Sequence, residues 1–101
     1  MVTLTTIRED LKEIRYYYSR KDFFDKGFDN TGVNEIINKV KKYNTIATKA
    51  PPKLYDMYLS LYINYNTQEL LADKLSYTPE YIQKLNKRLL KFLQENFIEN
   101  D

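Results

Sequence analysis

The sequence predicts an all-α protein of about five helices, in which an N-terminal helical part packs on a C-terminal pair of helices with a long last helix. Apolar residues recur at three- and four-residue steps through most of the chain, which is the period of an amphipathic helix. Only two Gly and three Pro interrupt 101 residues, and 43% of them are apolar, enough for one modest core. We therefore expect a single domain over residues 1–101, with a helical part at 1–50 and a two-helix module within 52–97.

Two helices are expected in the N-terminal part. Thr6 and Glu9 have the spacing of a capping box, so the first helix is expected to begin there. Residues 25–32 are rich in turn formers, and a second helix is expected over about 33–48, before the Pro-Pro pair at 51–52. The positions expected to face inward are Ile7, Leu11, Ile14, Tyr18, Ile36, Ile37, Val40, Tyr43 and Ala47.

The C-terminal module is expected to contain a third helix over about 52–64, a short helix and a long last helix. Thr67 is a good N-cap for the short helix, and Ala72 is small where two helices must approach closely. After a short turn, Thr78 caps the last helix and Pro79 occupies its first position, where a missing N–H costs nothing. The positions expected to face inward, or to lie on or near the inward face, are Leu54, Met57, Tyr58, Leu61, Tyr62, Leu70, Leu71, Ala72, Leu75, Ile82, Leu85, Leu89, Leu93 and Phe97.

The last helix carries a basic outer face opposite its apolar stripe. Gln83 can make a bidentate pair with adenine and Lys84 can reach guanine acceptors, whereas the cations further along suit phosphate oxygens. The alternative is an ordinary solvated helix face, because charged residues cover most helix exteriors. The candidate DNA contacts are Thr67, Thr78, Glu80, Tyr81, Gln83, Lys84, Lys87, Arg88 and Lys91.

One spacing in this module resembles region 4 of sigma-70-type factors, where capping Ser or Thr, a packed Ala and aliphatic core residues recur. The residues that carry it are Thr67, Ala72, Leu75, Thr78 and Ile82. The chain also resembles the small phage late-gene transcription regulators of the ArpU, RinA and LtrC type, over about residues 55–97. That resemblance implies a sigma-like helix-turn-helix and a DNA-binding regulator of phage or mobile-element genes. Leu70 departs from the pattern, in which Glu is common, and an apolar side chain there can meet the N-terminal helices or a partner.

The net charge of +2 is unevenly distributed along the chain. Residues 1–31 balance six cations against six acids, residues 32–55 hold five Lys and one Glu, and residues 77–94 hold four cations and one acid. The lysines of the middle segment are either a chance feature of solvated helices or additional phosphate contacts. They are Lys39, Lys41, Lys42, Lys49 and Lys53.

Several function classes are disfavoured by composition. The chain has neither Cys nor His, so the common nucleophile–base pairs and zinc sites are missing, and no Gly-rich phosphate loop is present. The N-terminus lacks the pattern of a signal peptide, and no stretch approaches the length of a membrane span. We therefore expect a cytoplasmic protein that is not an enzyme and that uses no metal or cofactor.

Two functional hypotheses of different classes follow. The first is a transcription regulator that binds double-stranded DNA through the last helix as a homodimer, since a single such module buries little surface. The second is a protein-binding interference factor that uses the same fold to bind RNA polymerase or a related phage activator and to block late transcription. The aromatic residues expected to form an exposed protein-contact patch are Tyr16, Tyr17 and Phe28.

Overall fold

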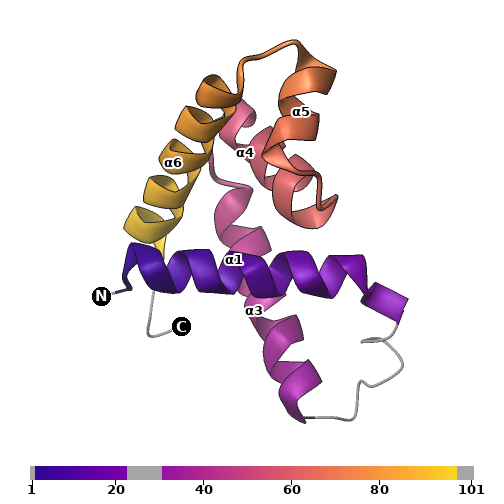
Figure 1. Ribbon diagram of the computed structural model, residues 1–101. Helices are drawn as coiled ribbons and strands as arrows, with labels where there is room; N and C mark the ends of the chain where they lie inside the picture. The colour runs from indigo at the N-terminus through magenta and orange to yellow at the C-terminus, as the bar shows by residue number, and fades with distance from the viewer. Residues whose placement is uncertain (1, 23–30, 98–101) are drawn as a thin grey trace.

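Every regular element in the described part of the chain is a helix, which confirms the predicted all-α class. The computed structural model describes residues 2–22 and 31–97. Its elements are α1 (Leu4–Ser19), α3 (Thr31–Ala47), α4 (Pro52–Tyr58), the π-helical segment η1 (Leu59–Ile63) that continues α4, α5 (Gln68–Leu75) and α6 (Pro79–Asn96). Helix α1 crosses beneath the unit formed by α4, α5 and α6, and α3 passes behind α1, with its C-terminal end leading toward α4 (Figure 1).

Among the described residues, a threonine side chain caps the first turn of α1, α5 and α6. The Oγ1 atoms of Thr3, Thr67 and Thr78 accept hydrogen bonds from the backbone N–H three residues later, at 3.0–3.1 Å. Each of these N-caps satisfies a helical donor that has no carbonyl partner. The predicted caps of α5 and α6 are therefore confirmed. The predicted capping box at Thr6 and Glu9 is wrong, because α1 begins one turn earlier.

The helix expected over 52–64 changes its winding halfway along. Beyond Tyr58 the segment η1 is a π-helix, and the N–H of Asn64 donates to the carbonyl of Leu59 at 2.8 Å. A π-turn adds a residue to the helical repeat, which changes the direction of the side chains that follow. The backbone then reverses through Tyr65, at a φ of 42°, and leads into α5. Apolar periodicity does not distinguish this widened turn from a regular α-helix.

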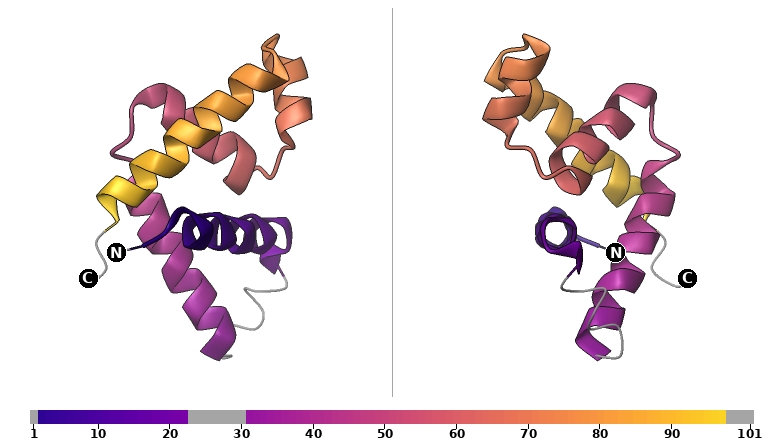
Figure 2. Two further views of the ribbon diagram at one scale, coloured as in Figure 1. Left: turned by 60° about the vertical axis from the view of Figure 1, so that its left-hand side comes forward. Right: turned by 90° about the vertical axis from the view of Figure 1, so that its right-hand side faces the viewer.

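One continuous hydrophobic cluster joins all the described helices, as expected for a single core. Figure 2 shows α6 passing diagonally above α1, and α1 contacts η1, α6 and α3. Some expectations about the core fail. Ile46 was not expected inward and is 7% exposed, whereas Leu70 and Leu75 were expected on the inward face and are each 45% exposed. Leu75 is the last residue of α5, and the chain turns away at Ser76 before the side chain can be covered. The fully buried large side chains are Ile7, Leu11, Ile14, Tyr43, Tyr58, Ile82, Leu85, Leu89 and Leu93.

Polar contacts fix α3 against its neighbours inside this core. The buried hydroxyl of Tyr43 donates to Oδ2 of Asp10 on α1 at 2.6 Å. Asn44 donates to the hydroxyl of Tyr18 at 2.9 Å and accepts from the hydroxyl of Tyr58 at 2.5 Å. Since unpaired buried polar groups are costly, these matched pairs favour one arrangement of α1, α3 and α4.

Candidate nucleic-acid interface

The turn between α5 and α6 sets the direction of the last helix. Ser76 lies in the left-handed region at a φ of 58°, and the N–H of Tyr77 donates to the carbonyl of Ala72 at 2.9 Å. This bond, together with the bond from Ser76 to the carbonyl of Asp73, is the Schellman pattern that ends a helix. Ala72 is 2% exposed, so its small side chain permits the close contact of α5 with α6 that the sequence predicted.

The outer face of α6 is open to solvent over its whole length. The apolar stripe of α6 is buried. The residues of α6 that were predicted to contact DNA lie on the opposite side, as expected for a helix whose apolar residues recur every three or four positions. Only Tyr81 of this set is half-buried. Thr67 and Thr78 are exposed, and their hydroxyls accept the capping bonds, which leaves each hydroxyl hydrogen able to donate to a ligand. The exposed members are Thr67, Thr78, Glu80, Gln83, Lys84, Lys87, Arg88 and Lys91.

Lys53 joins this face from α4. Its Nζ donates to the hydroxyl of Tyr81 at 3.1 Å and lies 5.6 Å from the centre of that ring. The Tyr81 ring in turn makes an edge contact with Tyr77, with their centroids 4.9 Å apart. The hydrogen bond to Tyr81 raises the pKa of Lys53, against a smaller opposing effect of the positive charge on Arg88. A middle-segment lysine therefore extends the cationic face beside the N-terminal half of α6.

The other middle-segment lysines lie on α3 or just beyond its end. Nζ of Lys39 lies 3.0 Å from Asp10 and also binds Glu13, so its charge is balanced by α1 within the fold. Burial works to lower the pKa of Lys39, but the bonds to Glu13 and Asp10 raise it overall. The prediction that Lys39 is available to phosphate is therefore wrong. Lys42 lies 4.3 Å from the ring centre of Phe97, and Lys41 and Lys49 are exposed at α3 and just beyond its end.

The predicted aromatic patch is only partly exposed. Tyr16 is 50% exposed, and the guanidinium of Arg20 lies over its ring at 4.7 Å. Tyr17 is 7% exposed and belongs to the core, so its predicted exposure is wrong. Three consecutive positions on a helix are about 100° apart, and here the second of them points inward. Phe28 lies outside the described residues. Leu70 is 45% exposed, so it does not pack against the N-terminal helices.

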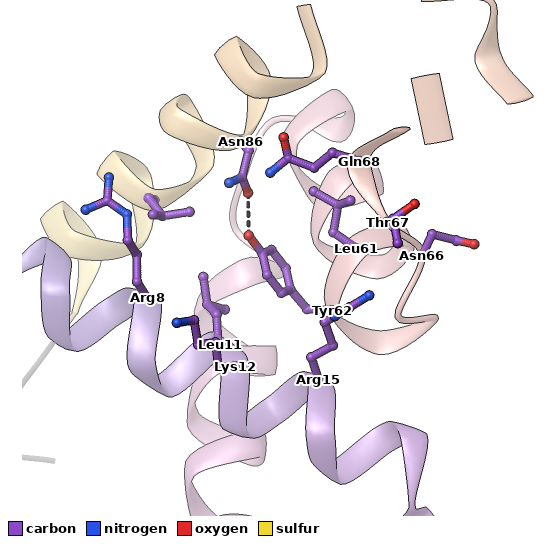
Figure 3. Close-up of a pocket in the computed structure, with 11 residues that line it drawn as sticks. Arg8, Leu11, Lys12, Arg15, Leu61, Tyr62, Asn66, Thr67, Gln68 and Asn86 are labelled. Carbon is purple, nitrogen blue, oxygen red and sulfur yellow. Dashed lines mark hydrogen bonds between the residues drawn. The ribbon is translucent and has the colours of Figure 1, made fainter. Parts of the chain in front are cut away.

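A second group of cations lies beside the α6 face, and the sequence reasoning missed it. Arg8, Lys12 and Arg15 line a surface groove between α1 and the beginning of α5, with Asn86 of α6 on its far wall (Figure 3). Their spacing of four and three residues was a usable signal, since it places three cations on one helix face. Residues 1–31 hold as many acids as cations, so their net charge gave no sign of this group. A net charge summed over a segment does not show how the charges are divided between the faces of a helix.

Comparison of the chain with protein-family models, with curated proteins and with solved structures gave no match. Among the described helices none is long and apolar enough to cross a membrane. In the same part of the chain, no cluster of three or more carboxylates has the arrangement of a metal site.

Proposed function

We propose that the protein is a DNA-binding transcription regulator of phage or mobile-element genes, and that α6 enters the major groove. The observation that carries this proposal is the outer face of α6, where Gln83 stands exposed among four exposed cations. An amide side chain can read adenine in the major groove, and the cations around it can neutralise phosphates on both sides.

The N-terminal ends of α5 and α6 also favour an approach of DNA to the outer face of α6. Thr67 and Thr78 place the positive ends of α5 and α6 at the surface, where helix N-termini favour anions. Glu80 is the one acidic residue exposed in the first turn of α6, and four cations follow it along the face. The four cations Lys84, Lys87, Arg88 and Lys91 predict a salt dependence of binding with a slope near −3.6, or about −0.9 for each phosphate neutralised.

Fluorescence anisotropy with DNA duplexes from around the protein's own coding sequence tests the proposal. We expect binding at low salt that weakens in Lys84→Ala/Lys87→Ala, with a slope reduced by about 2. Lys41→Ala/Lys49→Ala is a matched control, because it removes the same charge from the region of α3. Equal loss in both variants, or no binding by the wild type, would contradict the proposal. Sedimentation of the complex tests the expected homodimer.

A second candidate function has its own structural motivation. Leu70 and Leu75 are each 45% exposed and Tyr77 is 38% exposed, an unusual apolar content for the surface of one short helix and its turn. This favours contact with a protein, such as RNA polymerase or a related phage activator. Leu70→Lys/Leu75→Lys distinguishes the two proposals. Interference by protein contact predicts that the variant loses inhibition of late transcription in a reconstituted assay, whereas DNA recognition predicts that duplex affinity is kept.

A further inference from the structure

The two flanks of α1 carry opposite charges. Asp10 and Glu13 face α3, where both bind Lys39. Arg8 and Lys12 lie on the other flank, and no described carboxylate forms an ion pair with either of them. The apolar stripe of α1 separates the two groups, since Ile7, Leu11 and Ile14 are at most 1% exposed. Residues 1–31 carry no net charge as a sum, yet α1 within them presents a basic surface toward α5 and α6.

That surface forms one wall of a groove of about 430 Å³. Its floor is largely apolar, and its opposite wall is made by the start of α5 and by α6 (Figure 3). Among the described residues that line it none is acidic, and Glu69 in the first turn of α5 is not one of them. A concave site with three cations, several amides and no carboxylate is suited to an anion.

The polar groups of the groove are held in place by the fold. Nη2 of Arg15 donates to the carbonyl of Tyr65 at 3.0 Å, which fixes the guanidinium beside the start of α5. The hydroxyl of Tyr62 donates to Oδ1 of Asn86 at 2.5 Å, so the amide nitrogen of Asn86 remains as a donor on the groove wall. Thr67 lines the groove and caps the eight-residue helix α5, so the N-terminal end of α5 lies at the edge of the groove.

We propose that this groove is a phosphate-binding site, and that it takes a phosphate of the nucleic-acid backbone next to the duplex face of α6. The inference rests on the proposed function, because it assigns a second set of backbone contacts to the same complex. The cations of α1 recognise the charge of the phosphate, and the groups at the start of α5 donate hydrogen bonds to its oxygens.

Continuity with the α6 face favours a polymer over a small phosphorylated ligand. Asn86 and Leu90 line the groove, and Gln83 and Lys87 are each three residues before one of them. Residues three apart are neighbours on a helix surface, so the groove opens directly beside the exposed edge of α6. Arg8 and Arg15 are separated by roughly 10 Å along α1, which exceeds the axial spacing of about 3.4 Å between phosphates of one strand. The basic flank therefore suits a strand that continues past the groove.

The test compares three double variants on a duplex of random sequence, because electrostatic binding needs no cognate site. Arg8→Gln/Lys12→Gln alters the groove and leaves Arg15 in place to hold Tyr65. Lys84→Gln/Lys87→Gln alters the α6 face, and Lys41→Gln/Lys49→Gln is the control of equal charge. All four residues of the first two pairs are exposed, and thermal melting verifies that each variant folds.

We expect Arg8→Gln/Lys12→Gln to reduce the slope of log K against log salt by about 1, because the groove takes one phosphate, with the control near the wild type. If only the α6 variant binds more weakly, the groove inference fails and the proposed function stands. If only the groove variant binds more weakly, the groove stands and recognition by α6 fails. Absence of duplex binding by the wild type overturns both. A titration with inorganic phosphate distinguishes a site for free phosphate from a site for a nucleic-acid backbone. Saturable binding of phosphate in the groove without duplex binding would overturn the assignment to a nucleic-acid backbone.

Discussion

Replacing Asp10 by Ala should destabilise the protein by about 2–3 kcal/mol. The side chain of Asp10 accepts from the buried hydroxyl of Tyr43 at 2.6 Å and lies 3.0 Å from Nζ of Lys39. Tyr43 is 1% exposed, so its hydroxyl would lose its acceptor without gaining water, at a cost of about 1–3 kcal/mol. The contact with Lys39 is partly exposed, and Lys39 keeps Glu13, so that loss adds only about 0–1 kcal/mol.

Urea unfolding followed by far-ultraviolet circular dichroism measures this change. We expect the midpoint to fall by about 1–2 M urea with little change in slope. Glu13→Ala is the matched control, because Glu13 binds the same lysine without contacting a buried hydroxyl, and it should cost less than about 1 kcal/mol. In a double-mutant cycle with Tyr43→Phe, the two effects should be less than additive. Additive effects, or equal losses in Asp10→Ala and Glu13→Ala, would refute the role assigned to the buried bond.

Three further predictions concern the buried phenols, the turn and the cap of α6. Burial raises the pKa of Tyr43 and Tyr58, and raises the pKa of Tyr62 to about 12. Because the fold favours the neutral phenols, the stability that they contribute is complete below pH 10 and is lost as the pH rises above it, by up to about 1.4 kcal/mol per phenol and pH unit. A tyrosinate absorbance titration should therefore show a late phase that coincides with unfolding. Titration of all ten tyrosines near pH 10 in the folded state would contradict this prediction. Ser76→Gly should raise the melting temperature by about 2–8 °C, because Gly relieves a left-handed φ at a gain of roughly 0.5–1 kcal/mol, and an unchanged or lower value would show that Ser76 is not strained. Thr78→Ala should cost about 1 kcal/mol in urea unfolding through loss of the N-cap, whereas Thr78→Ser should cost little; equal losses would exclude the cap as the cause.

The features predicted correctly from the sequence depend on neighbours within one or two helical turns. The caps at Thr67 and Thr78 follow from residue type and position, and the buried stripe of α6 follows from helical period. The small Ala72 marked the contact of two helices adjacent in sequence. Local rules of this kind also placed the outer face of α6 correctly, since its exposure is the complement of the stripe.

The features that failed depend on how distant segments meet. Lys39 looked available because nothing near it in sequence reveals that α3 crosses α1 at Asp10 and Glu13. The exposure of Leu75 depends on where the turn directs the chain, and its apolar character gave no indication of this. The groove combines side chains from α1, η1, α5 and α6, so no single-segment pattern could show that Arg8 would lie opposite Asn86.

The N-terminal part of the chain also helps to set the positions of the C-terminal helices. Arg15 on α1 holds the carbonyl of Tyr65, the residue at which the backbone reverses from η1 into α5. A non-glycine residue at a φ of 42° is an unfavourable conformation, so a contact that stabilises it also stabilises the direction in which α5 starts. The direction of α5 sets the position of α6, through Ala72 and the turn at Ser76. In the proposed complex, the α1 cations therefore act on a duplex at α6 in two ways, by their charge and by the backbone that Arg15 fixes.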